Sequence, residues 1–378
     1  MLARLYYRLG PRALSLRRDG TAAAAVFFSL FVLASGILWL AGGQPTAAPL
    51  ALAASPSAVA VSATTDHVYL ATFTKNIVWA LDGAGGHVLG GIQLEAGTLA
   101  LMAVNPTTEH VYVVNLPHRI DVLAGTTMTL LTSLVLDGYP DGLAVDPVTN
   151  RVYVAIQSDP WRHAPARVVV MNGWNDSFVA EVPVGRLPLA VAANATTNRV
   201  YVANAAENTV SVIDGRTNAV LATIPVGPFP RALAVNPGTN LVYVGNRDNH
   251  SVSVVDGRDN AVVATVAVEG SPGAMAVNET TNRVYVAGDA GAVSVLDGTT
   301  NRVTTTLAAG PLPSGMAVNA KTNRVYVTSA GDNTVRMLQD HRFGLPQGRV
   351  VAGWFSAPVA TADPMASCLC DRPPTEQP

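Results

Sequence analysis

The stretch Pro230–Gly257 reads PRALAVNPGTNLVYVGNRDNHSVSVVDG, and it decides the fold class of the whole chain. Three short runs rich in Val, Ala and Tyr alternate in it with turns rich in Asn, Gly, Thr and Asp. Runs of about four to eight such residues, bounded by such turns, are typical of β-strands. The stretch therefore predicts three consecutive strands joined by tight turns.

Close copies of this stretch recur along the chain. A Val-Tyr pair returns at intervals of 41 to 48 residues, and its tyrosines are Tyr69, Tyr112, Tyr153, Tyr201, Tyr243, Tyr285 and Tyr326. A fourth apolar run closes each complete repeat, as in Ala219–Val226 (AVLATIPV). A period of about 42 residues with four short strands fits one blade of a propeller. We therefore predict an all-β fold, a seven-bladed β-propeller of four-stranded blades.

The fourth repeat shows the expected strands most clearly. We name them a, b, c and d in chain order, and we expect them at Leu189–Asn194, Arg199–Asn204, Thr209–Asp214 and Ala219–Val226. Strand b is almost wholly apolar, as expected of a strand buried on both faces between neighbouring blades. Pro183 and Pro225 hold equivalent places in strand d. Because proline cannot donate a backbone hydrogen bond, strand d should be the outer edge of each blade.

The repeats resemble the YVTN-type β-propeller family, which includes surface-layer-type and YncE-like extracytoplasmic proteins. The residues that carry the resemblance are Pro230–Gly257 and their counterparts, over about residues 56–340. Members of such families are mostly binding or scaffold proteins. The resemblance therefore implies a propeller outside the cytoplasm that binds a ligand or partner, and it implies no reaction.

The N-terminal region predicts a membrane segment before the propeller. Residues 1–18 contain five arginines and no acid, and residues 21–42 are mostly apolar and uncharged. A helix of that length spans the hydrocarbon core of a bilayer, and arginines before it place the N-terminus in the cytoplasm. We expect a single-pass cell-membrane protein with a basic cytoplasmic segment (1–20), an anchor (21–42), a linker (43–55), a propeller outside (56–355) and a disordered Pro-rich tail (356–378). The alternative is a signal peptide cleaved near Ala53, which leaves the propeller secreted.

Composition and motifs exclude several functions. A net charge of −2 and a pI of about 6.4 predict no general attraction to nucleic acid. Cys368 and Cys370, the only two cysteines, lie in the tail, so the core depends on no disulfide framework. The sequence contains no nucleophile elbow, phosphate-binding loop or metal-ligand spacing of His. We therefore predict no catalytic residue, no metal and no cofactor.

An enzyme is the alternative function. A propeller of the lactonase or quinoprotein dehydrogenase type needs carboxylates or histidines that converge at the mouth of the central channel. The nearest candidates are Asp141 and Arg231.

The repeats separate structural positions from candidate functional ones. The a–b and c–d turns are alike in most blades and should share one side of the ring, here called the constant face. The b–c and d–a loops differ between blades and should share the other side, here called the variable face. Arg199 and Asp214 should lie opposite each other on strands b and c. The largest irregularity is an insertion of about six residues in the third repeat, within Gln157–Pro165.

The insertion predicts a binding surface. It contains Trp161, Arg162 and His163, and most cations of the variable face lie in the same arc. Arginine suits carboxylate, phosphate or sulfate, and tryptophan offers a stacking surface. The predicted binding residues are Trp161, Arg162, His163, Arg119, Arg186, Arg231 and Asp141, and the predicted partner is an anionic polymer or an extracytoplasmic protein. The alternative is that Trp161 covers its own loop and that the arginines are solvated.

Strand d of the seventh blade has two possible sources. Arg349–Phe355 (RVVAGWF) contains good β-formers, and we expect it to supply this strand. The alternative is Pro49–Ala54 (PLALAA), which would close the ring with the N-terminal end of the domain.

Overall fold

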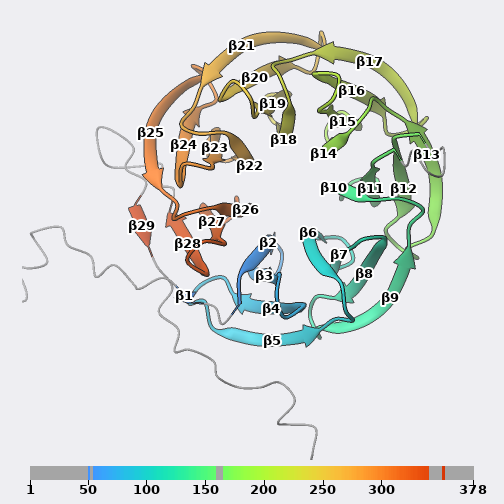
Figure 1. Ribbon diagram of the computed structural model, residues 1–378, viewed down its shortest axis with the longest axis vertical. Helices are drawn as coiled ribbons and strands as arrows, with labels where there is room; N and C mark the ends of the chain where they lie inside the picture. The colour runs from blue at the N-terminus through green and yellow to red at the C-terminus, as the bar shows by residue number, and fades with distance from the viewer. Residues whose placement is uncertain (1–49, 52–53, 159–164, 340–350, 354–378) are drawn as a thin grey trace, which may run out of the picture. The chain divides into compact units, whose positions relative to one another are not determined.

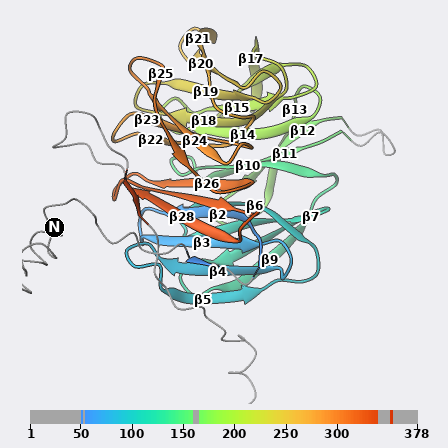
Figure 2. The same cartoon turned by 60° about the vertical axis from the view of Figure 1, so that its left-hand side comes forward.

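The chain folds into the predicted propeller. A computed structural model describes residues 50–51, 54–158, 165–339 and 351–353, with the backbone alone at 50–51 and 351–353. These residues form seven antiparallel sheets, six of four strands and one of five. The sheets are set around a common axis (Figure 1; Figure 2). The predicted cytoplasmic segment, anchor and tail lie outside the described residues. Within the described ranges, no helix is long and apolar enough to cross a membrane.

The strands take four radial positions in each blade. The innermost strands, a, are β2 (Pro56–Ser62), β6 (Thr98–Asn105), β10 (Pro140–Asp146), β14 (Pro188–Asn194), β18 (Pro230–Asn236), β22 (Pro272–Asn278) and β26 (Pro313–Asn319). The next strands, b, are β3 (His67–Thr72), β7 (His110–Leu116), β11 (Arg151–Ile156), β15 (Arg199–Asn204), β19 (Leu241–Asn246), β23 (Arg283–Gly288) and β27 (Arg324–Ser329).

The two outer positions follow in the same order. The c strands are β4 (Ile77–Asp82), β8 (Arg119–Ala124), β12 (Arg167–Asn172), β16 (Thr209–Asp214), β20 (Ser251–Asp256), β24 (Ala292–Asp297) and β28 (Thr334–Gln339). The d strands of the first six blades are β5 (Val88–Gln93), β9 (Thr129–Val135), β13 (Phe178–Pro183), β17 (Ala219–Pro225), β21 (Ala261–Ala267) and β25 (Arg302–Ala308). Figure 1 shows these d strands at the circumference. The prolines at the ends of β13 and β17 lie on this outer edge, where a missing backbone N–H leaves no neighbouring strand without a hydrogen bond.

The fourth blade has the predicted strands to within one residue at each end. The register of β15 and β16 places Arg199 opposite Asp214 and Tyr201 opposite Val212, as expected. The two side chains of the first pair nevertheless have different partners. Asp214 Oδ1 accepts hydrogen bonds from the backbone of Arg216 and Thr217, and Arg199 donates to a neighbouring blade.

The core lies between neighbouring blades. All seven repeat tyrosines are fully buried. Each hydrophobic cluster takes side chains from two blades, as where Tyr201 and Val212 of blade 4 pack with Val242 and Val255 of blade 5. The cluster that joins blade 7 to blade 1 contains Tyr326. A blade therefore buries strand b on both faces, which accounts for its apolar sequence.

The turns of the constant face depend on Asn and Gly for two different reasons. Asn198 and Asn218 have φ of 50° and 57°, a region that Asn tolerates better than most residues. Gly257, in an Asp-Gly turn, is not at positive φ, so it is needed for another reason. A Cβ there would lie 2.6 Å from the Tyr201 hydroxyl. Glycine is needed at this turn because the buried tyrosine of the preceding blade touches its backbone.

Both ends of the domain close the seventh blade. β1 (Leu50–Ala51) pairs with the first part of β28, with Leu50 opposite Val335. β29 (Val351–Gly353) pairs with the second part, with Ala352 opposite Leu338. The two segments together occupy the place of one d strand. The choice between two sources was therefore too narrow, because each supplies part of the outer strand.

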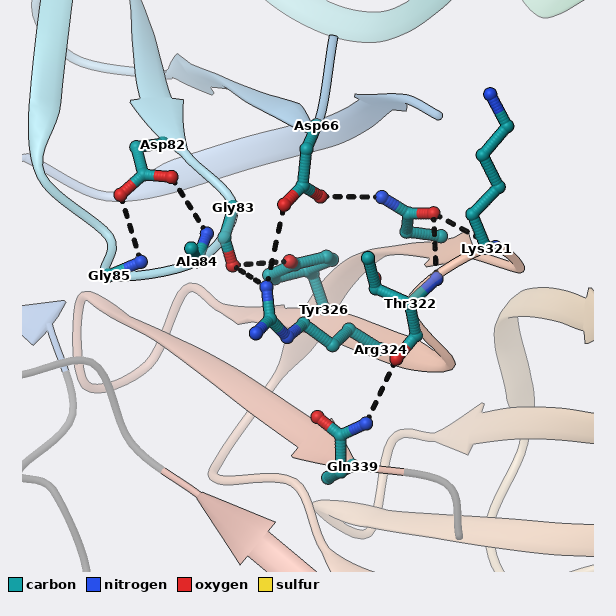
Figure 3. A network of polar contacts seen from close by, with 11 residues as sticks. Asp66, Asp82, Gly83, Ala84, Gly85, Lys321, Thr322, Arg324, Tyr326 and Gln339 are labelled. Atoms are coloured by element: carbon teal, nitrogen blue, oxygen red, sulfur yellow. Dashed lines mark hydrogen bonds and ion pairs between the residues drawn. The ribbon is translucent and has the colours of Figure 1, made fainter. Parts of the chain in front are cut away.

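Polar side chains join the seventh blade to the first on the constant face (Figure 3). Asn319 donates to Asp66 Oδ1 over 2.6 Å, and the Arg324 guanidinium lies 3.5 Å from Asp66 Oδ2. Arg324 and the Tyr326 hydroxyl both donate to the carbonyl of Gly83, at 2.6 and 3.0 Å. Burial raises the pKa of Tyr326 to about 12, so it remains a donor at physiological pH. Ring closure therefore uses backbone pairing at the rim and side-chain hydrogen bonds nearer the axis.

Candidate binding site on the variable face

Three strand b arginines, Arg151, Arg199 and Arg324, have structural roles on the constant face. Arg151 donates to the carbonyl of Gly215, and Arg199 donates to that of Gly257. Each bond crosses from strand b of one blade to the c–d turn of the next, as the Arg324 bond does at ring closure. The residues shared among repeats therefore connect blades, and the variable face is the place to search for a binding site.

The insertion in blade 3 lies largely outside the described residues. Trp161, Arg162 and His163 fall within 159–164, so their part in a binding site stays a prediction. A hollow of about 330 Å³ is lined by Asp137, Pro165, Arg167, Glu181 and Pro183. Arg167 is 5% exposed, and it donates to the carbonyls of Asp137 and Pro165. Its Nε lies 3.2 Å from Glu181, so this arginine holds the loops of blade 3 together.

Arg119 is already paired with two carboxylates. Its Nε lies 3.1 Å from the carboxylate of Asp121, which is 1% exposed, and its Nη1 lies 2.5 Å from Glu95. Asp121 also accepts hydrogen bonds from Asn115 and Ser133. A buried carboxylate needs such partners, because an unpaired charge in the interior is costly. Arg119 neutralises Asp121, and an external anion would compete with two carboxylates for it.

Arg186 is held by a weaker contact. Its side chain is 72% exposed, and its Nε donates to Glu207 over 3.3 Å. An ion pair at the surface stabilises a protein by roughly 0–1 kcal/mol, so an anionic ligand can replace Glu207 at little cost. Arg186 therefore remains accessible to a ligand, unlike Arg119.

Asp141 and Arg231 occupy matching positions in two blades. Each is the second residue of an innermost strand, β10 or β18, at a β-bulge where the pairing with strand b skips one residue. Such a bulge leaves the extra residue outside the ladder and re-aims its side chain. The seven equivalent residues around the ring are Ser57, Ala100, Asp141, Leu189, Arg231, Gly273 and Ser314. Two of the seven are charged, and their charges are opposite.

The positive charge of Arg231 is felt at Asp141, although the two residues belong to different blades. Blade 4 separates their blades along the ring, and Figure 1 shows β10 and β18 both facing the centre. Burial raises the pKa of Asp141 above its usual range, while the hydrogen bond from Gln157 and the positive charge of Arg231 act to lower it. No ion pair forms, so the guanidinium and carboxylate lie farther apart than 4.0 Å.

The hydrogen-bond partners differ sharply between the two residues. Gln157 donates from Nε2 to Asp141 Oδ2, and among the described residues Oδ1 accepts no hydrogen bond. Arg231 is exposed and makes no hydrogen bond with any described side chain or backbone group. The polar serines of the ring are committed, since Ser57 donates to Ala71 and Ser314 to Pro56. Arg231 and one oxygen of Asp141 are therefore free for an external ligand.

Gln157 and Glu207 were missed as partners of the predicted residues. Gln157 was visible as the first residue of the inserted loop, but nothing in its spacing showed that it reaches Asp141, 16 residues away. The described residues contain no group of three or more His, Cys, Asp or Glu able to hold a metal ion.

The comparisons with known proteins leave the fold as the main guide. No protein-family model matches the chain, and no curated protein matches it either. The structure establishes a seven-bladed propeller.

Proposed function

We propose that this chain is a non-catalytic, extracytoplasmic binding propeller of the YVTN type, and that its variable face receives the ligand. The observation that carries this proposal is a difference in contacts between two sets of arginines. Arg151 and Arg199 on strand b donate to neighbouring blades, whereas Arg186 and Arg231 on the variable face keep exposed guanidinium groups at positions where the repeats differ. Arg216 and Arg258 are also exposed, but they lie in the c–d turns that the repeats share. Exposed arginine on a rigid scaffold is well suited to bind anionic groups.

The proposed partner is an anionic extracytoplasmic polymer or an acidic protein surface. Trp161, Arg162 and His163 of the inserted loop would extend the surface outward from Arg186. The proposed anchor at residues 21–42 would hold this surface outside the membrane, and cleavage near Ala53 would release it instead.

Affinity capture tests this function. The full-length chain in detergent serves as bait for extracytoplasmic extract, and a chain with Arg186→Glu and Arg231→Glu serves as the matched control. We expect the parent to retain acidic polymers or proteins that the control loses. Retention of the same material by both chains would reject the variable face as the binding surface.

A propeller enzyme is the second candidate, and one observation favours it. Burial raises the pKa of Asp141, and carboxylates with raised pKa values are common among catalytic acids and bases. Turnover of a lactone or alcohol substrate that disappears in Asp141→Asn would favour the enzyme over the binding protein.

A further inference from the structure

We propose that Arg231 and Asp141 form the two poles of a binding site for a small zwitterion, whose carboxylate binds Arg231 and whose ammonium group binds Asp141. The inference deepens the proposed function, because it names a ligand class for one part of the variable face. It rests on the backbone, which places the two charges at the bulges of two innermost strands.

The bulges fix both residues at the same level of the ring. Pro140 pairs with Ile156 and Gly142 with Ala155, so Asp141 is the residue left over. Pro230 and Ala232 bracket Arg231 in the same way. Because the seven innermost strands are equivalent, the same irregularity in two blades brings the two residues to corresponding places around one axis.

The two charges attract each other without meeting. The charge of Arg231 lowers the pKa of Asp141, yet the groups are not within ion-pair distance. Arginine and aspartate side chains free to approach would form a direct pair with two parallel hydrogen bonds. Because they do not neutralise each other directly, both can be reached by a ligand, and the matching ligand carries a negative and a positive end.

The free hydrogen-bonding atoms agree with this ligand. Arg231 offers the planar fork that binds a carboxylate through two hydrogen bonds. Asp141 offers Oδ1, while Gln157 on Oδ2 fixes the orientation of the carboxylate. A simple anion would be attracted to Arg231 and repelled by Asp141, and a simple cation would meet the reverse. Only a ligand with both charges gains at both poles.

Calorimetric titration of the full-length chain tests the site with 4-aminobutyrate, butyrate and butylamine as probes. We expect 4-aminobutyrate to bind at least tenfold more tightly than either single-charge probe. Arg231→Gln and Asp141→Asn should each weaken its binding at least tenfold. Arg258→Gln, at an exposed arginine of the constant face, is the matched control and should leave binding unchanged. Thermal melting of each variant checks that it is folded, and Arg231→Lys should retain part of the affinity.

Three results would overturn the inference. Equal affinity for butyrate and 4-aminobutyrate would make the site one for simple anions. An equal loss in Arg258→Gln would make the attraction nonspecific. No binding of any probe at up to about 10 mM, well above the Kd of weak small-ligand sites, would show that the two charges form no site. Each of these results leaves the capture of polymers by Arg186 and the inserted loop intact, so the two proposals fail separately.

Discussion

Asn319 Nδ2 lies 2.6 Å from Asp66 Oδ1, and this hydrogen bond joins the last blade of the ring to the first. Between several internal blades the same contact joins two asparagines, as between Asn194 and Asn240 at 2.8 Å and between Asn236 and Asn282 at 2.8 Å. The aspartate at ring closure keeps the acceptor and adds a charge that attracts Arg324. The chain therefore closes its ring with a charged version of the contact used between internal blades.

Replacement of Asp66 tests this contact. Asp66 has φ of 56°, so Asp66→Gly removes the side chain without backbone strain. We expect this variant to lose about 1–3 kcal/mol in the free energy of unfolding, because the buried amide of Asn319 loses its acceptor. Asp66→Asn keeps an acceptor and should lose less than about 1 kcal/mol. Chemical denaturation measures both, and equal stability of the Gly variant and the parent would show that the bond contributes nothing.

The divided outer strand of blade 7 predicts the effect of truncation. Deletion of residues 345–378 removes β29, and deletion of residues 1–51 removes β1. Each should lower the melting temperature, because each exposes part of the edge of β28. Deletion of residues 356–378 alone is the control and should change little. An unchanged melting temperature after removal of β29 would mean that β1 closes the blade unaided.

Replacement of Asp141 and of Asp332 by asparagine should have opposite effects on stability at pH 7. Burial raises the pKa of Asp141, so its ionised form destabilises the folded protein above that pKa. Asp141→Asn should therefore raise stability at pH 7 by up to about 1 kcal/mol, and the gain should vanish as the pH falls below the ordinary pKa of aspartate. Thermal melting from pH 7 to pH 3 measures this difference between variant and parent.

Asp332 supplies the matched comparison. Burial acts to raise its pKa, but hydrogen bonds from Arg336 and Thr334 outweigh burial and lower the pKa to about 2. A lowered pKa contributes stability above the ordinary value, and that contribution is lost as the pH falls towards 2. Asp332→Asn should therefore destabilise at pH 7 by at most about 1 kcal/mol. A loss of stability in Asp141→Asn at pH 7 as large as that in Asp332→Asn would contradict the assignment of Asp141 as an unfavourable buried charge.

The sequence predicted the fold well because the same local signals occur in every blade. The Val-Tyr pairs marked strand b, and the buried tyrosines explain why that marker persists. The candidate site was harder, because the sequence does not show which arginines are already paired. Glu95 lies 24 residues from Arg119 and Glu207 lies 21 residues from Arg186, on different loops. Likewise, the bulges at Asp141 and Arg231 arise from pairing between strands, which composition alone does not reveal.

The proposed membrane anchor gives a prediction that is independent of the propeller. Residues 21–42 follow five arginines, so the intact protein should fractionate with membranes and resist carbonate extraction. Protease added from outside should reach the propeller. Recovery of a mature protein that begins near Ala54 would replace the anchor with a cleaved signal peptide.

The affinity of the variable face for its captured ligand tests the central claim most directly. The decisive comparison is between the parent and a double variant, Trp161→Ala with Arg186→Ala, with Arg216→Ala and Arg258→Ala on the constant face as the control pair. Truncation of an aromatic or arginine anchor in an interface costs about 2 kcal/mol or more. We predict at least tenfold weaker binding by the variable-face double variant, with nearly unchanged thermal stability and no loss in the control. Equal binding by the double variant and the parent would contradict the account.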